Sequence, residues 1–230
     1  MKRNIPNAIT CCNLISGCIA IVFALYGEVG MALLWIIIGA VFDFFDGMSA
    51  RLLNVSSPIG KELDSLADDV TFGVAPSCIV FNFLSSIHQH VVFLPFIAFL
   101  IAAFSALRLA KFNLDERQAT SFIGLPTPAN ALFWGALIVS MGDKLESSSY
   151  LIAAVVVMIF VSCYLLIAEI PLFALKFKHW GWKGNEVKYI FILTAAVMIV
   201  VPMLMGLGVI GISAAIAWYT VLSAVTSKRN

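Results

Sequence analysis

Charged residues are scarce in this chain, which has 14 basic and 13 acidic side chains among 230 residues. Hydrophobic residues make up 61% of the sequence, and the mean hydropathy is +1.00. A water-soluble domain of this length does not need so apolar a composition. The sequence therefore excludes the ordinary soluble folds and predicts an all-α polytopic membrane protein, for which no nucleic-acid partner is expected.

Polar stretches long enough to form a separate soluble domain are also missing. Apolar runs of about 17 to 25 residues, separated by charged or turn-rich breaks, predict about eight transmembrane helices. The chain is therefore expected to form a single integral membrane domain over residues 1–230. The expected helices cover 7–26, 30–50, 66–87, 91–113, 127–142, 148–170, 188–205 and 207–226.

The usual patterns of redox, zinc and covalent-nucleophile sites are absent from the sequence. Its five cysteines show no CxxC spacing, and its three histidines have no partners at ligand spacing. No Ser–His or Cys–His pair presents a separate nucleophile. No convincing internal repeat is present either, which disfavours a transporter built from inverted halves.

Basic residues fall almost entirely on one side of the expected helix arrangement. Of the 14 lysines and arginines, only Lys144 falls on the other side. Cytoplasmic loops carry an excess of lysine and arginine. We therefore expect both termini and the acidic run described next on the cytoplasmic side of a bacterial inner membrane.

Acidic residues are concentrated between residues 43 and 68. Asp43 and Asp46 are three apart, and Asp64 and Asp68 are four apart, so each pair shares a helix face. Two neighbouring helices can therefore aim four carboxylates into one cavity. Two like charges about 4 Å apart cost on the order of 4 kcal/mol at an effective dielectric constant near 20. Oxygen-only ligands favour Mg²⁺ or Mn²⁺, and a two-metal carboxylate site suits chemistry on a phosphate ester.

Small residues follow the first pair of acids. Gly47 removes the side chain from the helix face and Ala50 leaves only a methyl group, so a bulky planar group can lie close to the backbone. Arg51 supplies a forked donor suited to a diphosphate. In the alternative interpretation the acids only mark helix ends. Asp43 fits that interpretation poorly, because phenylalanines surround it and the helix is expected to continue past it.

The complete pattern is DxxDGxxAR, then eight residues, then GxxxDxxxD. It resembles the signature of the CDP-alcohol phosphotransferase family with every spacing kept. These membrane enzymes transfer a phosphatidyl or related group from a CDP-linked donor to an alcohol and release CMP. The resemblance implies a six-helix core, here with two more helices, and two divalent cations per site. It implies that Asp43, Asp46, Asp64 and Asp68 bind metal and that Asp68 is also the general base.

The same resemblance assigns donor contacts to the residues beside these acids. It implies that Gly47, Ala50 and Arg51 contact the CDP group and that Gly60 closes the binding loop. Ser57 lies where a small hydroxyl residue often meets the donor phosphates in this family.

Two further stretches resemble the phosphatidylserine synthases, the serine-using branch of the family. Residues 5–17 resemble their first helix, where the region of Asn7 and Thr10 flanks the nucleotide. Residues 108–128 resemble the junction of their fourth and fifth helices, and Arg108 and Lys111 are expected to meet the serine carboxylate there. The resemblance thus implies CDP-diacylglycerol, L-serine and membrane lipid as partners.

The same residues also fit other interpretations. Arg108 and Lys111 also fit plain anchoring at the cytoplasmic boundary. Another acceptor, glycerol 3-phosphate or inositol phosphate, would use the same chemistry but should need a denser basic cluster. A cation transporter would use the acids as an ion site, but the outer halves of the helices are nearly all apolar. The helices over 148–226 are expected to act as scaffold or as the face of a homodimer.

Overall fold

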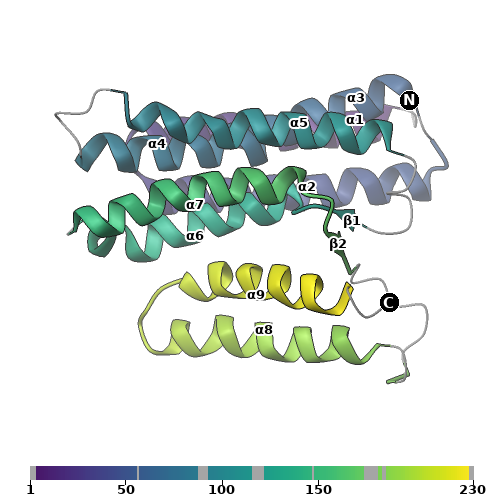
Figure 1. The fold of residues 1–230 in the computed structure, drawn as a ribbon. Helices are drawn as coiled ribbons and strands as arrows, with labels where there is room; N and C mark the ends of the chain where they lie inside the picture. The colour runs from purple at the N-terminus through teal and green to yellow at the C-terminus, as the bar shows by residue number, and fades with distance from the viewer. Residues whose placement is uncertain are drawn as a thin grey trace.

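Helices form almost all of the regular structure (Figure 1). The structure is a computed structural model, and it describes residues 4–55, 57–87, 93–115, 122–146, 148–173, 181–182 and 185–227. The element η2 is a π-helix and η3 a 3-10 helix. The elements are α1 (Ile5–Leu25), α2 (Val29–Leu52), α3 (Pro58–Asp68), η2 (Asp69–Val74), α4 (Ala75–Ile87), η3 (Pro95–Phe99), α5 (Leu100–Leu114), β1 (Phe122–Ile123), α6 (Thr127–Glu146), α7 (Ser149–Ile167), β2 (Pro171–Leu172), α8 (Glu186–Leu204) and α9 (Ile210–Ser227).

The helix lengths confirm the expectation of an integral membrane protein. By length and composition, five helical segments of the described chain can cross a membrane. Because α3, η2 and α4 follow one another without a break, and η3 continues into α5, the described helices form eight rods, the number that the sequence predicts. The five candidate spans are Ile5–Leu25, Val29–Leu52, Pro95–Leu114, Ser149–Ile167 and Glu186–Leu204.

The third helical rod begins earlier than the sequence analysis predicts, at Pro58 instead of residue 66. The start has a clear local cause, since Ser57 is the N-cap, its hydroxyl oxygen accepts a hydrogen bond from the backbone N–H of Gly60 (3.0 Å), and proline is favoured in a first turn. Hydropathy missed this helix because its polar first turns resemble a loop in composition. The correction matters because Asp64 thereby sits on a regular helix.

Packing is very close where η2 meets α1 and α2. A side chain at Gly17 would place its Cβ 2.8 Å from the Cα of Thr71, and one at Gly39 would place its Cβ 3.0 Å from Asn13 Oδ1. These two glycines therefore let three helical segments approach one another. The π-helix follows directly after Asp68, and π-helical turns of this kind occur frequently at functional sites.

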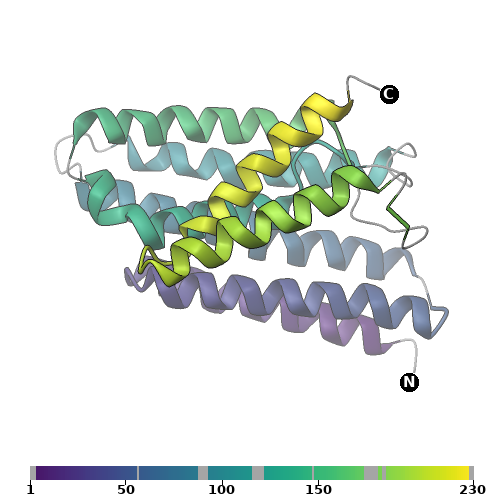
Figure 2. The ribbon, with the colours of Figure 1, turned by 90° about the horizontal axis from the view of Figure 1, so that it is seen from below.

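The rods are arranged in layers (Figures 1 and 2). The helix α1 packs against α2, α3 and α4, while α6 packs against α2, α4 and α9. The outermost helix, α8, packs against α9 and has no buried residue. In Figure 2, α8 and α9 cross the other helices obliquely. The described start of α1 and the described end of α9 lie at the same end of the bundle (Figure 1), as an even number of rods requires.

A short β-ladder ties two loops together at that end. Phe122 pairs with Leu172, and Ile123 with Pro171, in antiparallel register. Gly124 follows with a φ of 75° and donates its backbone N–H to the carbonyl oxygen of Ile170 (3.0 Å). A glycine suits this position because other residues rarely adopt positive φ. The ladder holds the segment after α5 against the end of α7.

Candidate active site

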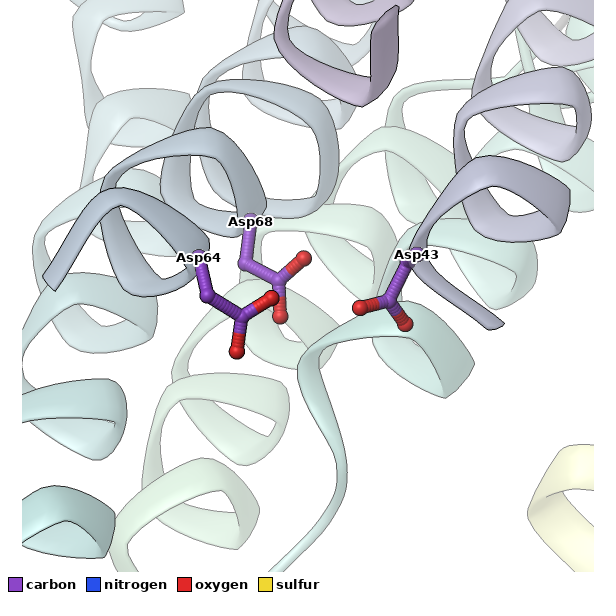
Figure 3. Close-up of side chains that lie close together, drawn as sticks. All are labelled: Asp43, Asp64 and Asp68. Atoms are coloured by element: carbon purple, nitrogen blue, oxygen red, sulfur yellow. The ribbon is translucent and has the colours of Figure 1, made fainter. Parts of the chain in front are cut away.

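Three carboxylates from two helices converge on one point (Figure 3). Asp43 comes from α2, and Asp64 and Asp68 come from successive turns of α3. One ligand atom from each residue lies within 4.8 Å of the others. This acid cluster is partly buried, so its charges strongly repel one another unless cations are present. The oxygen-only donor set fits a hard divalent cation.

The fourth predicted acid lies beside this cluster. Asp46 is only 6% exposed, and its carboxylate oxygen lies 2.6 Å from the hydroxyl oxygen of Thr10, which donates the hydrogen bond. Asp46 and Asp64 also lie on the wall of the same cavity. This placement agrees with the prediction that four acids face one region. Asp46 lies one helical turn after Asp43 on α2 and is not one of the three acids that converge most closely.

This first cavity has a volume of about 260 Å³ and lies between α1, α2 and α3. It contains most of the residues that the sequence analysis assigns to donor binding. Gly47 and Ala50 leave its α2 wall open, and a Cβ at Gly47 would come no closer than 4.0 Å to its nearest neighbour, the guanidinium of Arg51. The full lining is Pro6, Asn7, Thr10, Asp46, Gly47, Ala50, Val55, Ser57, Gly60, Lys61 and Asp64.

The start of α3 forms the tightest part of this wall. A Cβ at Gly60 would lie 3.0 Å from Ser57 Oγ and 3.1 Å from Asn7 Oδ1. A larger residue at position 60 would therefore press on two of the predicted donor contacts. This close approach explains why glycine fits here.

Two basic residues near the first cavity are placed differently. Arg51 is exposed and folds back on its own helix, donating from Nε to the carbonyl oxygen of Gly47 (2.9 Å), and it is not part of the cavity lining. Lys61 does line the cavity, and its Nζ donates to the carbonyl oxygen of Asn113 (2.9 Å). From the motif, Arg51 is the first candidate for the diphosphate contact, and Lys61, which follows Gly60, is the second, for donor phosphate or a lipid headgroup. Of these two basic residues, only Lys61 belongs to the cavity lining.

A second cavity of about 390 Å³ contains Arg108 and Lys111, the two basic residues predicted to meet serine. Arg108 is only 7% exposed, and its Nε has no hydrogen-bond partner among the described residues. Its guanidinium carbon lies 5.3 Å from the centre of the Phe112 ring, and its charge attracts that of Asp68. An arginine that only anchors a helix end keeps its charged group in water, whereas the guanidinium of Arg108 is buried and close to the acid cluster. This placement favours a role in the site over plain anchoring. The remaining lining is Leu114, Asp115, Ile123, Leu166, Ile167, Ala168 and Glu169.

The end of α7 is a part of this second cavity that the sequence analysis did not indicate. Residues 166–169 reach the cavity because the β-ladder brings the segment after α7 alongside the segment after α5. No motif in these residues could have revealed this contact. Some residues named in the sequence analysis lie outside the described parts of the chain. They are the three histidines, at positions 88, 90 and 179, and most of the lysines and arginines expected on the cytoplasmic side.

Together these features suit a transfer reaction on a phosphate ester. The acid cluster shares Asp64 with the first cavity, and Asp68 attracts Arg108 of the second. A nucleotide-linked donor and a small acceptor can therefore approach the same carboxylates from two cavities. The acids offer both metal ligands and a proton acceptor.

Comparison with known proteins gives the same assignment. Over 128 residues the chain is 45% identical to the CDP-diacylglycerol–serine O-phosphatidyltransferase of Bacillus subtilis (strain 168), which covers 54% of this chain and 69% of that protein. The proteins with the same name in Helicobacter pylori (strain J99 / ATCC 700824) and Saccharomyces cerevisiae (strain ATCC 204508 / S288c) are 36% and 41% identical over 129 and 146 residues. These alignments cover 55% and 56% of this chain, and the chain spans about half the length of those two proteins, 54% and 51%.

The family comparison covers more of the chain than these pairwise alignments. The match to the CDP-alcohol phosphatidyltransferase family extends over residues 3–174, which includes both cavities, the acid cluster and the end of α7. The motif spacing, the convergence of the acids and this match all agree. The chain belongs to the CDP-alcohol phosphatidyltransferase family.

Proposed function

We propose that this protein transfers the phosphatidyl group of CDP-diacylglycerol to the hydroxyl group of L-serine and releases CMP. The observation that carries the proposal is the convergence of Asp43, Asp64 and Asp68 between a cavity open at Gly47 and a buried arginine, Arg108. The names of the similar proteins from bacteria and yeast support serine as the acceptor.

In the proposed reaction, Asp68 accepts the proton of the serine hydroxyl group, whose oxygen attacks the phosphorus next to diacylglycerol. A new phosphorus–oxygen bond forms on that side, and the bond to CMP breaks, so CMP leaves with the bonding electrons. The reaction is a direct displacement without a covalent enzyme intermediate. Gly47 and Ala50 hold the cytidine group against α2, and Lys61 and Arg51 lie near the place of the diphosphate.

The proposal includes two divalent cations, Mg²⁺ or Mn²⁺, held by Asp43, Asp46, Asp64 and Asp68. The structure supports a cation at the acid cluster, because three carboxylates within 4.8 Å of one another fit oxygen coordination. Bound cations would neutralise charge on the diphosphate and on the departing CMP. Asp46 lies next to the cluster and on the wall of the donor cavity, so it would hold a cation on the donor side of the cluster.

The charges of the second cavity favour serine over the phosphorylated acceptors. Arg108 and Lys111 share this cavity with Asp115 and Glu169. A serine zwitterion can place its carboxylate near the two basic side chains and its ammonium group near one of the two acidic side chains. Glycerol 3-phosphate or inositol phosphate would bring a phosphate toward the same two acids, which repel it. The cation-transporter alternative is disfavoured by membership of this enzyme family.

We further propose that the acid cluster faces the cytoplasm of a bacterial inner membrane. This orientation rests on the basic residues near the same end of the bundle, such as Arg51, Lys61 and Lys111. The acyl chains of the donor would then lie between helices in the cytoplasmic leaflet. Homodimer formation through the C-terminal helices stays a prediction.

The proposed reaction is tested by incubating the purified protein with CDP-diacylglycerol, Mg²⁺ or Mn²⁺ and a panel of alcohols, and measuring CMP release. We expect release with L-serine and formation of phosphatidylserine. Release only with glycerol 3-phosphate or an inositol phosphate would instead select the alternative acceptor. No release with any alcohol would refute the enzyme assignment.

A first variant tests the donor cavity. Gly47→Val should lower CMP release at least about 100-fold, because the new methyl groups occupy the space assigned to the nucleotide and displace the reacting phosphorus. Folding should be preserved, since a Cβ here meets only the flexible Arg51 at 4.0 Å. The matched control is Gly30→Val on the same helix, where a Cβ meets nothing within 4 Å. If Gly47→Val retains normal activity, CDP does not lie against this face.

A second variant tests the acceptor cavity. Arg108→Gln should raise the serine KM by one to two orders of magnitude and leave the KM for CDP-diacylglycerol nearly unchanged, because a charge-assisted hydrogen bond contributes about 1.5 to 3 kcal/mol. Arg108→Lys should recover part of the loss, since lysine keeps the charge but lacks the forked geometry. An unchanged serine KM in folded Arg108→Gln would assign the carboxylate contact elsewhere, with Lys111 next.

A further inference from the structure

The side chain of Asn13 makes a hydrogen bond to a member of the acid cluster. It lies in the first half of α1 and is completely buried. Its Nδ2 donates to Asp68 Oδ1 across 3.0 Å. The nitrogen is the end that faces Asp68, because an amide oxygen there would be repelled by the carboxylate. One oxygen of the proposed general base is therefore already engaged by α1.

The surroundings of Asn13 hold its side chain in place. The hydroxyl group of Thr71 donates to the backbone carbonyl oxygen of Asn13 (3.0 Å), which fixes η2 against α1. On the other side, the missing side chain of Gly39 leaves just enough room, since a Cβ there would lie 3.0 Å from Asn13 Oδ1. Close packing on both sides restricts rotation of the amide.

The amide also has a feature that a purely structural contact would avoid. Asn13 Oδ1 is buried and has no hydrogen-bond partner in the described part of the chain. Burying an amide oxygen without a partner opposes folding, and an apolar side chain of similar shape would avoid that cost. The benefit of asparagine at this position must therefore come from its other end, the N–H group that meets Asp68.

We propose that Asn13 is a positioning residue, which holds one oxygen of the Asp68 carboxylate so that the other is presented to the acceptor hydroxyl group. This inference rests on the proposed function, in which Asp68 accepts the proton. Without Asn13, the Asp68 carboxylate would be free to rotate, and both of its oxygens would be available to hold a cation. Proton transfer then becomes slower while the affinity for the cation is kept. Loss of a metal ligand would instead lower the affinity for the cation.

The test compares Asn13→Leu with the wild type in the full-length, detergent-purified protein. We expect turnover to fall about ten- to hundredfold, which is typical of losing a partner that orients a ligand at a metal site. The KM for CDP-diacylglycerol should stay within about threefold, since Asn13 does not line the donor cavity. The affinity for Mn²⁺, measured by calorimetry without substrates, should be equal or higher. The melting temperature should change by no more than about 4 °C.

The control variant is Ser16→Ala, one turn along the same buried face of α1. Its hydroxyl group donates only to its own helix, at the carbonyl oxygen of Cys12 (2.8 Å), so both activity and Mn²⁺ binding should match the wild type. Asn13→Ala serves as a second variant in case leucine does not fit, with the same expected results. Loss of cooperative melting in both Asn13 variants would make the residue a folding determinant and overturn the proposal.

Two other results would also overturn the proposal. One is turnover of Asn13→Leu within about threefold of the wild type, and the other is weaker Mn²⁺ binding in proportion to the lost turnover. If the wild type uses another alcohol in place of serine, the same comparison is made with that alcohol, so an error in the acceptor leaves the test of Asn13 intact. A wild type without any CMP release would refute the proposed function itself.

Discussion

Asp43→Ala should abolish CMP release and binding of the divalent cation together. Asp43 is the one member of the acid cluster that comes from α2, so its loss leaves only the two acids of α3 at that point. Because a catalytic metal ion contributes several kcal/mol to transition-state stabilisation, we expect activity to fall by about 10³-fold or more. Calorimetric titration with Mn²⁺ and measurement of CMP release test the two parts separately.

A control for Asp43→Ala is the same substitution at Asp143, an exposed acid at the far end of α6. Asp143→Ala should retain wild-type activity and cation affinity. Normal turnover of Asp43→Ala at ordinary Mg²⁺ or Mn²⁺ concentrations would refute the metal-assisted mechanism. Restored turnover at high cation concentration would instead support it, because a weakened site can be filled by mass action.

Asp68→Asn should separate proton transfer from donor binding. The substitution keeps the shape of the side chain but removes the negative charge that accepts the proton, and general-base catalysis contributes about 10²- to 10⁴-fold. We therefore expect turnover to fall by this factor while CDP-diacylglycerol affinity stays within about tenfold. Single-turnover kinetics together with an equilibrium donor-binding assay measure both quantities.

The corresponding control is Glu62→Gln, which removes an exposed acid from the same helix. It should leave turnover near the wild-type value. If Asp68→Asn loses donor affinity as strongly as it loses turnover, Asp68 acts mainly as a metal ligand, and the proton acceptor must be another group. The turnover of Asp68→Asn reports loss of the general base, and the turnover of Asn13→Leu reports a general base that is present but wrongly oriented. Comparing the two turnover values distinguishes these cases.

Several features of this protein follow from the sequence alone. Long apolar runs make a helical membrane protein unavoidable, because backbone groups inside a bilayer must be hydrogen-bonded within the chain. The spacing of Asp43 and Asp46, and of Asp64 and Asp68, predicts shared helix faces from the helical period. Gly47 predicts an open wall because it has no side chain, and the cavity lining agrees with that interpretation.

Other features depend on contacts between segments that are distant in the sequence. The start of α3 at Pro58 was missed, because a hydropathy window reads a polar helix as a loop, although the cap at Ser57 was visible. The contribution of residues 166–169 to the second cavity arises from pairing between β1 and β2, which no local pattern encodes. Asn13 belongs to the stretch over residues 5–17 that resembles the first helix of the phosphatidylserine synthases, but nothing in that stretch indicates its contact with Asp68.

The difference between the two groups has a physical reason. Helical periodicity and side-chain chemistry are local, so the sequence by itself determined the membrane helices, the acidic pairs and the chemistry to which they are suited. The distance between Asn13 and Asp68, the burial of Arg108 and the division of the site into two cavities depend on how helices pack. That packing is set by close approach at positions such as Gly17 and Gly39, and only the tertiary structure decided it.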